Sequence, residues 1–337
     1  MKEIAIPTIK DIKNLKGKRV VLRLDFNVPT QNGKIVETMR IDRALPTVEY
    51  LIKKKARVII LSHIGKDASS SLKPVVQYLN TLPATTYRSK KTGGDGGRRK
   101  MKVGFVPDFR TEQARMVVDS LPEGGVVVFE NLRLDNRELE NDPEFAKYLA
   151  SFGDVYVNDA FAVSHRAHAS VVGITKYLPS YIGLLISDEI KNLSLALNPK
   201  HPFLFILGGA KFDTKMPLKI AIKNIDNVSS TEIIVDVGPE TIKNLAHILK
   251  KTKLVVWNGP LGYYEGGFDK GTITLLNEIA EIKATSIIGG GDTAVVVEKL
   301  GLGNKLSFVS TGGGATLDYL SDGKLVGIDA VIKCKKR

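Results

Sequence analysis

Short runs of β-branched and aliphatic residues alternate along this chain with longer segments in which apolar residues recur every three or four positions. The short runs fit buried strands, and the longer segments fit amphipathic helices. Such alternation is typical of β-α units around a parallel sheet that is buried on both faces. The expected strands are 19–24, 57–61, 103–106, 126–129, 154–157, 203–207, 254–256, 287–288 and 308–309, and the expected helices are 40–55, 112–121, 143–151, 181–198 and 293–300.

The length of 337 residues exceeds the usual size of a single core, so we expect two domains. The expected fold class is α/β, with two Rossmann-like three-layer α/β/α domains whose parallel sheets are joined by a long interdomain helix. The first domain would span residues 1–180 and the helix 181–198, which Pro199 and Pro202 follow. The second domain would span 199–320, and a C-terminal tail, 321–337, would pack back toward the first domain.

The formal net charge is +13, which invites a nucleic-acid interpretation. Most of this excess lies in residues 88–102 and in the last five residues, and such a distribution suits a local anionic ligand better than a polyphosphate backbone. No apolar run reaches the length of a membrane span, and residues 1–18 lack the apolar core of a signal peptide. One cysteine, Cys334, cannot form an internal disulfide. We therefore expect a cytoplasmic monomer with no membrane or nucleic-acid partner.

Polar residues follow four expected strands of the first half of the chain. They are Asp25, Asn27, His63, Lys66, Arg133 and Arg166. The carboxyl ends of parallel strands meet at one edge of a sheet, where open α/β folds bind ligands. A basic basin there would suit a small substrate bearing phosphate and carboxylate, because the arginine fork matches both groups. Taken singly, these residues could also be turn formers or structural side chains. His165 and His168 could bind a metal ion, but no third ligand stands at a supporting spacing.

Glycine-rich segments follow three expected strands of the second half, at 208–209, 289–291 and 312–314. Each alone could be a tight turn, but three on one sheet make a shelf for nucleotide phosphates, because glycines let backbone N–H groups approach an anion. Asp292 would repel a bare phosphate, so it either caps the following helix or helps to hold a metal ion that the phosphates also touch. Neither a P-loop nor a dinucleotide-binding glycine motif with an acidic ribose clamp occurs, so hydride chemistry is not expected.

A series of motifs closely resembles those of the phosphoglycerate kinase family, in that family's order and over nearly the whole chain. They are Leu24-Asp25-Phe26-Asn27-Val28-Pro29, Ser62-His63-Ile64-Gly65, Glu130-Asn131-Leu132-Arg133, Asn158-Asp159-Ala160-Phe161 with His165-Arg166-Ala167-His168, Gly208-Gly209-Ala210-Lys211, Trp257-Asn258-Gly259-Pro260, Gly289-Gly290-Gly291-Asp292-Thr293 and Thr311-Gly312-Gly313-Gly314-Ala315. The resemblance implies reversible phosphoryl transfer between 1,3-bisphosphoglycerate and ADP, giving 3-phosphoglycerate and ATP, with Mg²⁺ as the cofactor.

The resemblance also implies roles for individual residues. The phosphoglycerate ligands would be Asp25, Asn27, Arg40, His63, Lys66, Arg133 and Arg166. The nucleotide ligands would be Gly208, Gly209, Lys211, Lys215, Asn258, Pro260, Glu265, Gly289, Gly290, Gly291, Asp292 and Thr293. Asp292 would be the carboxylate on the magnesium side, and the groups that meet the transferring phosphoryl would be Arg40, Lys215, Gly313 and Gly314.

Three departures from the family pattern stand out. Lys66 replaces the usual arginine, which keeps the charge but loses the bidentate fork. The basic, glycine-rich loop 85–100 has no counterpart in the family pattern. After Val228 the chain continues at Ile233, where family members carry several dozen more residues, including a strand end beside the adenine. This loss should uncover part of the second sheet and weaken adenine binding.

Three functional hypotheses follow. The leading one is the phosphotransferase. The second is a relative that binds nucleotide and phosphoglycerate but has lost catalysis with the missing segment. The third is RNA binding through the Arg88 to Lys102 loop.

Overall fold

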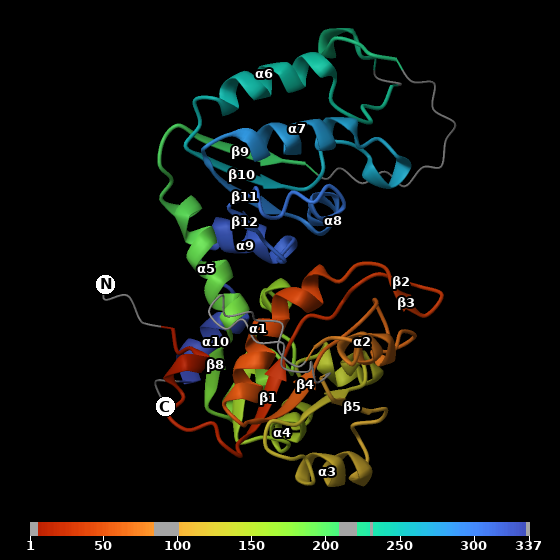
Figure 1. Cartoon of the computed structure of the whole chain (residues 1–337), viewed down its shortest axis with the longest axis vertical. Helices are drawn as coiled ribbons and strands as arrows, with labels where there is room; N and C mark the ends of the chain where they lie inside the picture. Colours follow the sequence, from red (N-terminus) through yellow and green to blue (C-terminus); the bar gives the residue numbers. More distant parts are fainter. Residues whose placement is uncertain (1–5, 84–100, 209–220, 230–231, 335–337) are drawn as a thin grey trace. The chain divides into compact units, whose positions relative to one another are not determined.

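The computed structural model describes residues 6–83, 101–208, 221–229 and 232–334, and it divides into two compact units (Figure 1). The first unit comprises the chain up to Ile190 together with the stretch from Lys324 onward, and the second unit runs from Lys191 to Gly323. Among the described residues, no helix combines the length and the apolar character needed to cross a membrane. The basic, glycine-rich loop 85–100 lies outside the described residues, so the RNA hypothesis stays a prediction.

The first unit is built on a parallel sheet in the order β5-β6-β4-β1-β7-β8. Its strands are β1 (Arg19–Arg23), β4 (Arg57–Leu61), β5 (Val103–Val106), β6 (Val126–Phe129), β7 (Val155–Asn158) and β8 (Ser180–Ile182). The strands are short and rich in valine and isoleucine because both of their faces are covered. Since all of them run the same way, their carboxyl ends meet at one edge, as the sequence predicted.

Helices cover both faces of this sheet. Val20 and Leu22 belong to a core with α1 (Met39–Lys53) and α2 (Lys73–Leu79), whereas Val21 belongs to a core with α3 (Glu112–Asp119) and α4 (Pro143–Ala150). Alternate residues of one strand thus face opposite layers, which confirms the α/β/α arrangement. The remaining elements of this unit are β2 (Thr30–Gln31), β3 (Lys34–Ile35), α10 (Val326–Cys334), η1 (Ile9–Asp11), η2 (Leu132–Leu134), η3 (Asn136–Glu138), η4 (Phe161–Val163) and η5 (Gly173–Lys176).

The long helix α5 (Leu184–Leu197) begins later than the sequence analysis expected. Residues 181 and 182 belong to β8, because Ser180–Ile182 pairs in parallel with Tyr156–Asn158. Gly183 separates strand from helix, and only glycine fits there, since a Cβ would lie 2.2 Å from Cγ of Asp159. The expected helix 181–198 is therefore wrong at its start, because Tyr181 and Ile182 belong to the sheet and the helix begins at Leu184.

The second unit has a four-stranded parallel sheet in the order β12-β11-β10-β9. Its strands are β9 (Phe203–Leu207), β10 (Leu254–Asn258), β11 (Thr285–Gly289) and β12 (Phe308–Val309). Its helices are α6 (Pro239–Leu249), α7 (Lys270–Glu281), α8 (Gly291–Lys299) and α9 (Gly314–Asp322), with the short turns η6 (Ile225–Asn227) and η7 (Tyr264–Gly266). Ile206, Trp257 and Ile288 lie side by side on one face and form a core with α6 and α7.

Candidate functional site

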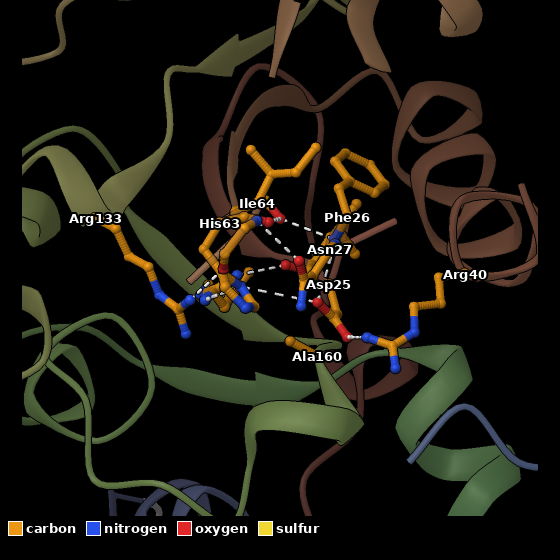
Figure 2. Close-up of polar contacts among 12 residues, drawn as sticks. Asp25, Phe26, Asn27, Arg40, His63, Ile64, Arg133 and Ala160 are labelled. Atoms are coloured by element: carbon orange, nitrogen blue, oxygen red, sulfur yellow. Dashed lines mark hydrogen bonds and ion pairs between the residues drawn. The ribbon is translucent and has the colours of Figure 1, made fainter. Parts of the chain in front are cut away.

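A cluster of charged side chains lies at the carboxyl edge of the first sheet (Figure 2). Asp25 follows β1, His63 follows β4 and Arg133 follows β6, so the sheet alone brings these three together. Arg40, from the first turn of α1, approaches Asp25 from the side opposite to Arg133. The structure therefore unites four of the residues that the sequence nominated.

Asp25 is the centre of this cluster. Its Oδ2 accepts a hydrogen bond from Nη1 of Arg40 at 2.6 Å, and its Oδ1 lies 3.8 Å from Nδ1 of His63. Burial alone would raise the pKa of Asp25, but Arg40, His63 and Arg23 outweigh it and hold that pKa below its usual range. Asp25 is therefore ionised at neutral pH, and it holds Arg40 in position before any ligand arrives.

His63 is buried beside three arginines, Arg23, Arg133 and Arg40, and burial lowers its pKa to about 3 against the opposing attraction of Asp25. Nη2 of Arg23 lies 3.3 Å from Nδ1 of His63. Because a guanidinium only donates, Nδ1 is the acceptor of this bond, and the proton of the neutral ring then sits on Nε2. His63 can thus donate one hydrogen bond to an anionic ligand without adding charge.

Arg23 and Glu138 form a buried layer behind the cluster that the sequence analysis missed. Nε of Arg23 donates to Oγ of Ser170 at 2.8 Å, and Ser170 in turn donates to both carboxylate oxygens of Glu138, at 2.6 and 2.9 Å. Burial raises the pKa of Glu138 against the influence of Arg23 and Ser170. The signal for Arg23 was present, because it is an arginine inside an apolar strand, and such a buried charge requires a partner.

The Gly65 turn links two more of the nominated residues, Asn27 and Lys66, to Arg133. Oδ1 of Asn27 accepts from the backbone N–H of Gly65 at 2.9 Å, and Nη1 of Arg133 donates to the carbonyl oxygen of Gly65. Lys66, the next residue, is exposed. Asn27 and Arg133 therefore fix the turn from which Lys66 projects.

Arg166 is exposed, with its Nε 3.1 Å from Nε2 of His165. Burial lowers the pKa of Arg133, and the positive charges of Arg166 and Arg23 lower it further, so this edge carries an excess of positive charge. Burial also lowers the pKa of His168, to about 4. Within the described part of the chain, no group of three or more histidine, cysteine, aspartate or glutamate side chains is arranged to hold a metal ion, so the histidine metal site is not supported.

The carboxyl edge of the second sheet is made by close backbone contacts. A Cβ on Gly208 would lie 2.1 Å from the carbonyl oxygen of Pro260, and a Cβ on Gly289 would lie 2.7 Å from Oδ1 of Asn258. Gly290 adopts φ +94°. These glycines are therefore required by the packing of the strand ends, which leaves the edge lined by backbone.

Two buried polar atoms at this edge have no hydrogen-bond partner among the residues that the structure describes: Oδ1 of Asn258 and Oγ1 of Thr293. A buried polar atom without a partner is costly unless a ligand or water satisfies it, so both atoms indicate a binding position. Helix α8 begins at this edge, directly after Gly290, and α9 begins after Gly313, at Gly314. The first N–H groups of a helix can bind an anion.

Asp292 is not a helix cap. The N-cap of α8 is Gly290, which makes the half-buried Asp292 a residue of the first turn, so the capping alternative is wrong. Glu265 lies exposed in η7, and Pro260 is buried after β10. Gly209, Lys211 and Lys215 lie outside the described residues.

Asp159, which follows β7, is fully buried at the N-terminus of α5. Its Oδ1 accepts from the backbone N–H of Ile186 at 2.9 Å, and Oγ1 of Thr47 on α1 accepts from the N–H of Leu184 at 3.0 Å. Burial raises the pKa of Asp159 to about 7, against hydrogen bonds from Thr47 and from the start of α5. The helix that carries Arg40 is thus bonded directly to the first turn of α5.

Comparisons with known proteins agree on one family. The family model described as phosphoglycerate kinase matches residues 9–228 and 218–324. The chain is 36% identical over 407 aligned positions to a phosphoglycerate kinase of Thermosipho africanus, with 98% of each chain covered, and 36% identical over 400 positions to one of Clostridium beijerinckii. Among solved structures, the phosphoglycerate kinase of Pyrococcus horikoshii matches with a TM-score of 0.82 at 25% identity, and that of Coxiella burnetii with 0.74 at 32% identity; each alignment covers 98% of this chain.

The same alignments bear on the expected internal gap. The alignment to the Thermosipho protein is longer than the 337 residues of this chain, so that relative carries residues that are absent here. The two family matches overlap over residues 218–228, which places the gap beside this stretch and agrees with the shortening expected after Val228. With its motifs, its two parallel sheets and these relatives in accord, the chain belongs to the phosphoglycerate kinase family.

Proposed function

We propose that this chain catalyses reversible phosphoryl transfer between the acyl phosphate of 1,3-bisphosphoglycerate and ADP, with the carboxyl group of 3-phosphoglycerate as the acceptor in the reverse direction. The observation that carries the proposal is the cluster of Asp25, Arg40, His63 and Arg133, in a chain whose family membership covers both sheets. The extent of that match favours an enzyme over a relative that only binds its ligands. As a glycolytic enzyme it would act in the cytoplasm.

The edge of the first sheet would bind the phosphoglycerate. Arg133, Arg166 and Lys66 would hold its phosphate, because the guanidinium fork matches an anion of that shape. His63 would donate from Nε2, and the carboxylate of Asp25 with the amide of Asn27 would accept from and donate to the remaining oxygens. Arg40, held by Asp25, would lie beside the carboxyl group that gains or loses the phosphoryl.

The edge of the second sheet would bind the nucleotide. The phosphates would lie beside Gly208 and Gly289, whose lack of side chains leaves room for them, and the backbone N–H groups at Gly290 and Gly291 would point at them. The side-chain atoms of Asn258 and Thr293 that have no partner among the described residues would gain ligand hydrogen bonds. Further nucleotide ligands are proposed at Gly209, Lys211, Lys215, Pro260 and Glu265.

Asp292 fits the role of a magnesium ligand. Mg²⁺ is usually held by one or two carboxylates together with substrate phosphates, and Asp292 is a carboxylate in the first turn of α8, beside the proposed phosphate site. Bound there, the ion would neutralise charge on the nucleotide phosphates.

The transfer itself needs positioning and positive charge rather than covalent help. Arg40, Lys215 and the N–H groups of Gly313 and Gly314 would surround the equatorial oxygens of the phosphoryl group. No general base is required in the ATP-forming direction, because the attacking oxygen of ADP is already anionic. Since the two ligands are assigned to different units, we propose that α5 serves as the hinge on which they close and exclude water.

The decisive test is a coupled assay of ATP consumption at saturating 3-phosphoglycerate and Mg²⁺, with parallel calorimetry for each ligand. We expect turnover that depends on both substrates and disappears with EDTA. A reaction without 3-phosphoglycerate measures background hydrolysis. Calorimetric binding of both ligands with no turnover would instead support the relative that has lost catalysis.

A further inference from the structure

A series of buried polar groups runs from Glu138 through Ser170 and Arg23 to His63. Each of these residues is at most 4% exposed, although Arg23 and Glu138 are ionisable side chains of opposite charge. Arg23 lies in β1, His63 follows β4 and Glu138 lies in η3, so the fold brings them together from distant parts of the sequence. Burial of a charge is unfavourable unless partners compensate it. The contacts that Arg23 makes therefore decide where its guanidinium can lie.

The hydroxyl of Ser170 joins the two ionisable groups. It accepts from Nε of Arg23 at 2.8 Å and donates to Oε1 of Glu138 at 2.6 Å, while the backbone N–H of Ser170 donates to Oε2 of the same carboxyl at 2.9 Å. Tyr156 fixes this residue further, because its hydroxyl donates to the carbonyl oxygen of Ser170 at 2.6 Å. A guanidinium only donates, so the single proton of the Ser170 hydroxyl points to Glu138. Arg23 is thus held by its Nε, with Nη2 beside Nδ1 of His63.

Two groups compete for Nδ1 of His63. Nη2 of Arg23 lies 3.3 Å from this nitrogen and needs an acceptor, whereas Oδ1 of Asp25 lies 3.8 Å from it and favours a proton there (Figure 2). The ring is neutral, because burial lowers its pKa to about 3, so its one proton lies on either Nδ1 or Nε2. With Arg23 held in place the proton lies on Nε2. If Arg23 moved away, Asp25 would draw the proton to Nδ1.

We propose that Ser170 and Glu138 are positioning residues of the phosphoglycerate site: they hold Arg23 so that His63 keeps its proton on Nε2 and donates it to an anionic oxygen of the ligand. This role rests on the proposed function, in which His63 contacts phosphoglycerate. In the other tautomer, Nε2 would turn a lone pair toward that oxygen, and two acceptors repel one another. The buried groups therefore control ligand binding without touching the ligand, through the hydrogen bond at the far side of the ring.

The first experiment reads the tautomer of His63 by nitrogen NMR of the histidine rings in the full chain without ligand, with the signals assigned through His63→Gln. We expect the wild-type proton on Nε2. Ser170→Ala removes the hydroxyl, and Glu138→Gln removes the charge and cannot accept both bonds from Ser170. In each variant the ratio of the Nδ1–H to the Nε2–H form should rise about tenfold or more.

The matched control is Ser164→Ala. Ser164 is also fully buried, and its hydroxyl likewise accepts one hydrogen bond, from Asn158, and donates one, to Ala160. Its loss removes a similar pair of bonds from the same part of the chain but leaves Arg23 in place, so the tautomer of His63 should not change. Circular dichroism checks that each variant is folded.

The second experiment measures binding and turnover of 3-phosphoglycerate. The Nε2–H donor would contact the ligand equally before and during phosphoryl transfer. Calorimetry should therefore show Kd about tenfold higher in Ser170→Ala and Glu138→Gln, with kcat within about twofold of wild type. Ser164→Ala should keep both values.

A wild-type ring that carries its proton on Nδ1 overturns the proposal. So do folded variants that keep the wild-type tautomer, or that bind 3-phosphoglycerate more weakly with no change in tautomer. A wild-type chain that neither binds nor turns over 3-phosphoglycerate would refute the proposed function instead. The tautomer is measured without ligand, so it still decides whether Ser170 and Glu138 control the proton of His63.

Discussion

The candidate sites at the two sheet edges differ in what forms them: charged side chains at the first edge and backbone at the second. At the first sheet edge, charged side chains are already bonded to one another: Asp25 to Arg40, and Arg23 to Ser170. At the second sheet edge, glycines bring backbone atoms together, and two side-chain atoms, on Asn258 and Thr293, have no hydrogen-bond partner within the described part of the chain. One edge is specified by which side chains are present, and the other by where they are missing.

This contrast teaches what each half-site should tolerate. A charge cluster fails when a charge is removed, because its partners stay buried and uncompensated. A backbone shelf fails when a side chain is added, because neighbouring main chain cannot move aside cheaply. Loss of a charge should therefore do most damage at the first edge, and addition of a side chain should do most damage at the second.

Removal of a charge at the first edge should have the largest effect. Arg40→Ala takes away the cation proposed to meet the phosphoryl group and leaves Asp25 buried without its closest partner. We expect kcat to fall about 10²- to 10³-fold, with a much smaller change in KM for phosphoglycerate. Steady-state kinetics measures both.

The matched control for this loss is Arg43→Ala. Arg43 lies one turn further along α1, where it forms a partly exposed pair with Asp188 at 3.4 Å, so its loss should cost at most about 1 kcal/mol and leave kcat nearly unchanged. An Arg40→Ala enzyme with wild-type kcat would remove Arg40 from the mechanism.

Addition of one methyl group at the second edge should come next. In Gly208→Ala the new Cβ would meet the carbonyl oxygens of Pro260 and Gly259, at 2.1 and 2.7 Å. We expect about 1–3 kcal/mol of lost stability, and weaker nucleotide binding, because the strand ends must move apart. Thermal unfolding and calorimetry with ADP report the two effects. Gly303→Ala serves as the control, since a Cβ there meets no atom within 4 Å; equal losses in both variants would contradict the packing argument.

The buried carboxyl of Asp159 should give the fold a pH-dependent stability. Its folded pKa of about 7 lies above the value of about 4 expected in the unfolded chain, so the folded state binds the proton more tightly. This contribution is fully present below about pH 4 and is lost as the pH rises through 7. Relative to wild type, Asp159→Asn should therefore gain about 4 °C in Tm between pH 5 and pH 8.

Asp154→Asn is the control of opposite sign. Burial raises the pKa of Asp154, but hydrogen bonds from Arg19 outweigh it and lower that pKa overall, so this carboxylate stabilises the fold above its unfolded pKa. Between pH 5 and pH 8 its loss should lower Tm by a constant amount. A flat difference for Asp159→Asn as well would show that Asp159 is charged throughout this range.

The smallest effect should come from restoring a fork at the first edge. Lys66→Arg keeps the exposed charge but adds bidentate geometry for a phosphate. We expect KM for phosphoglycerate to fall about twofold and kcat to stay the same. Lys73→Arg, a cation at the start of the nearby helix α2, provides the comparison. A fall in KM in both variants would point to general electrostatics rather than to the fork.

Much of the architecture was predictable because strands buried on both faces leave a strong apolar signal. All strands of the two main sheets except β8, and the polar ends at Asp25, His63 and Arg133, follow from that signal and from the parallel direction. The start of α5 did not follow, because Tyr181 and Ile182 suit a helix locally and are drawn into β8 by pairing with β7.

The candidate site was predictable where its residues follow a strand directly. It was less predictable where a buried residue supports the charged cluster from within the sheet. Arg23 was assigned to a strand without a role, since only the folded sheet reveals that Ser170 and Glu138 reach it from far along the chain. For Asp292 the sequence left two roles open, a helix cap or a metal ligand. The structure excludes the cap, because the N-cap of α8 is Gly290 and Asp292 lies in the first turn. The Asn32-Gly33 turn between β2 and β3 carries a clear local signature of a hairpin, with φ positive at both residues.

The Gly65 turn has a consequence for the order of events in binding. Because one N–H of Arg133 is already given to the carbonyl oxygen of Gly65, an incoming anion that needs this N–H competes with the backbone as well as with water. When the anion prevails, the carbonyl is released and the peptide that precedes Lys66 is free to rotate. Binding of the proposed phosphoglycerate and rotation of the Gly65–Lys66 peptide would then be one exchange of hydrogen-bond partners.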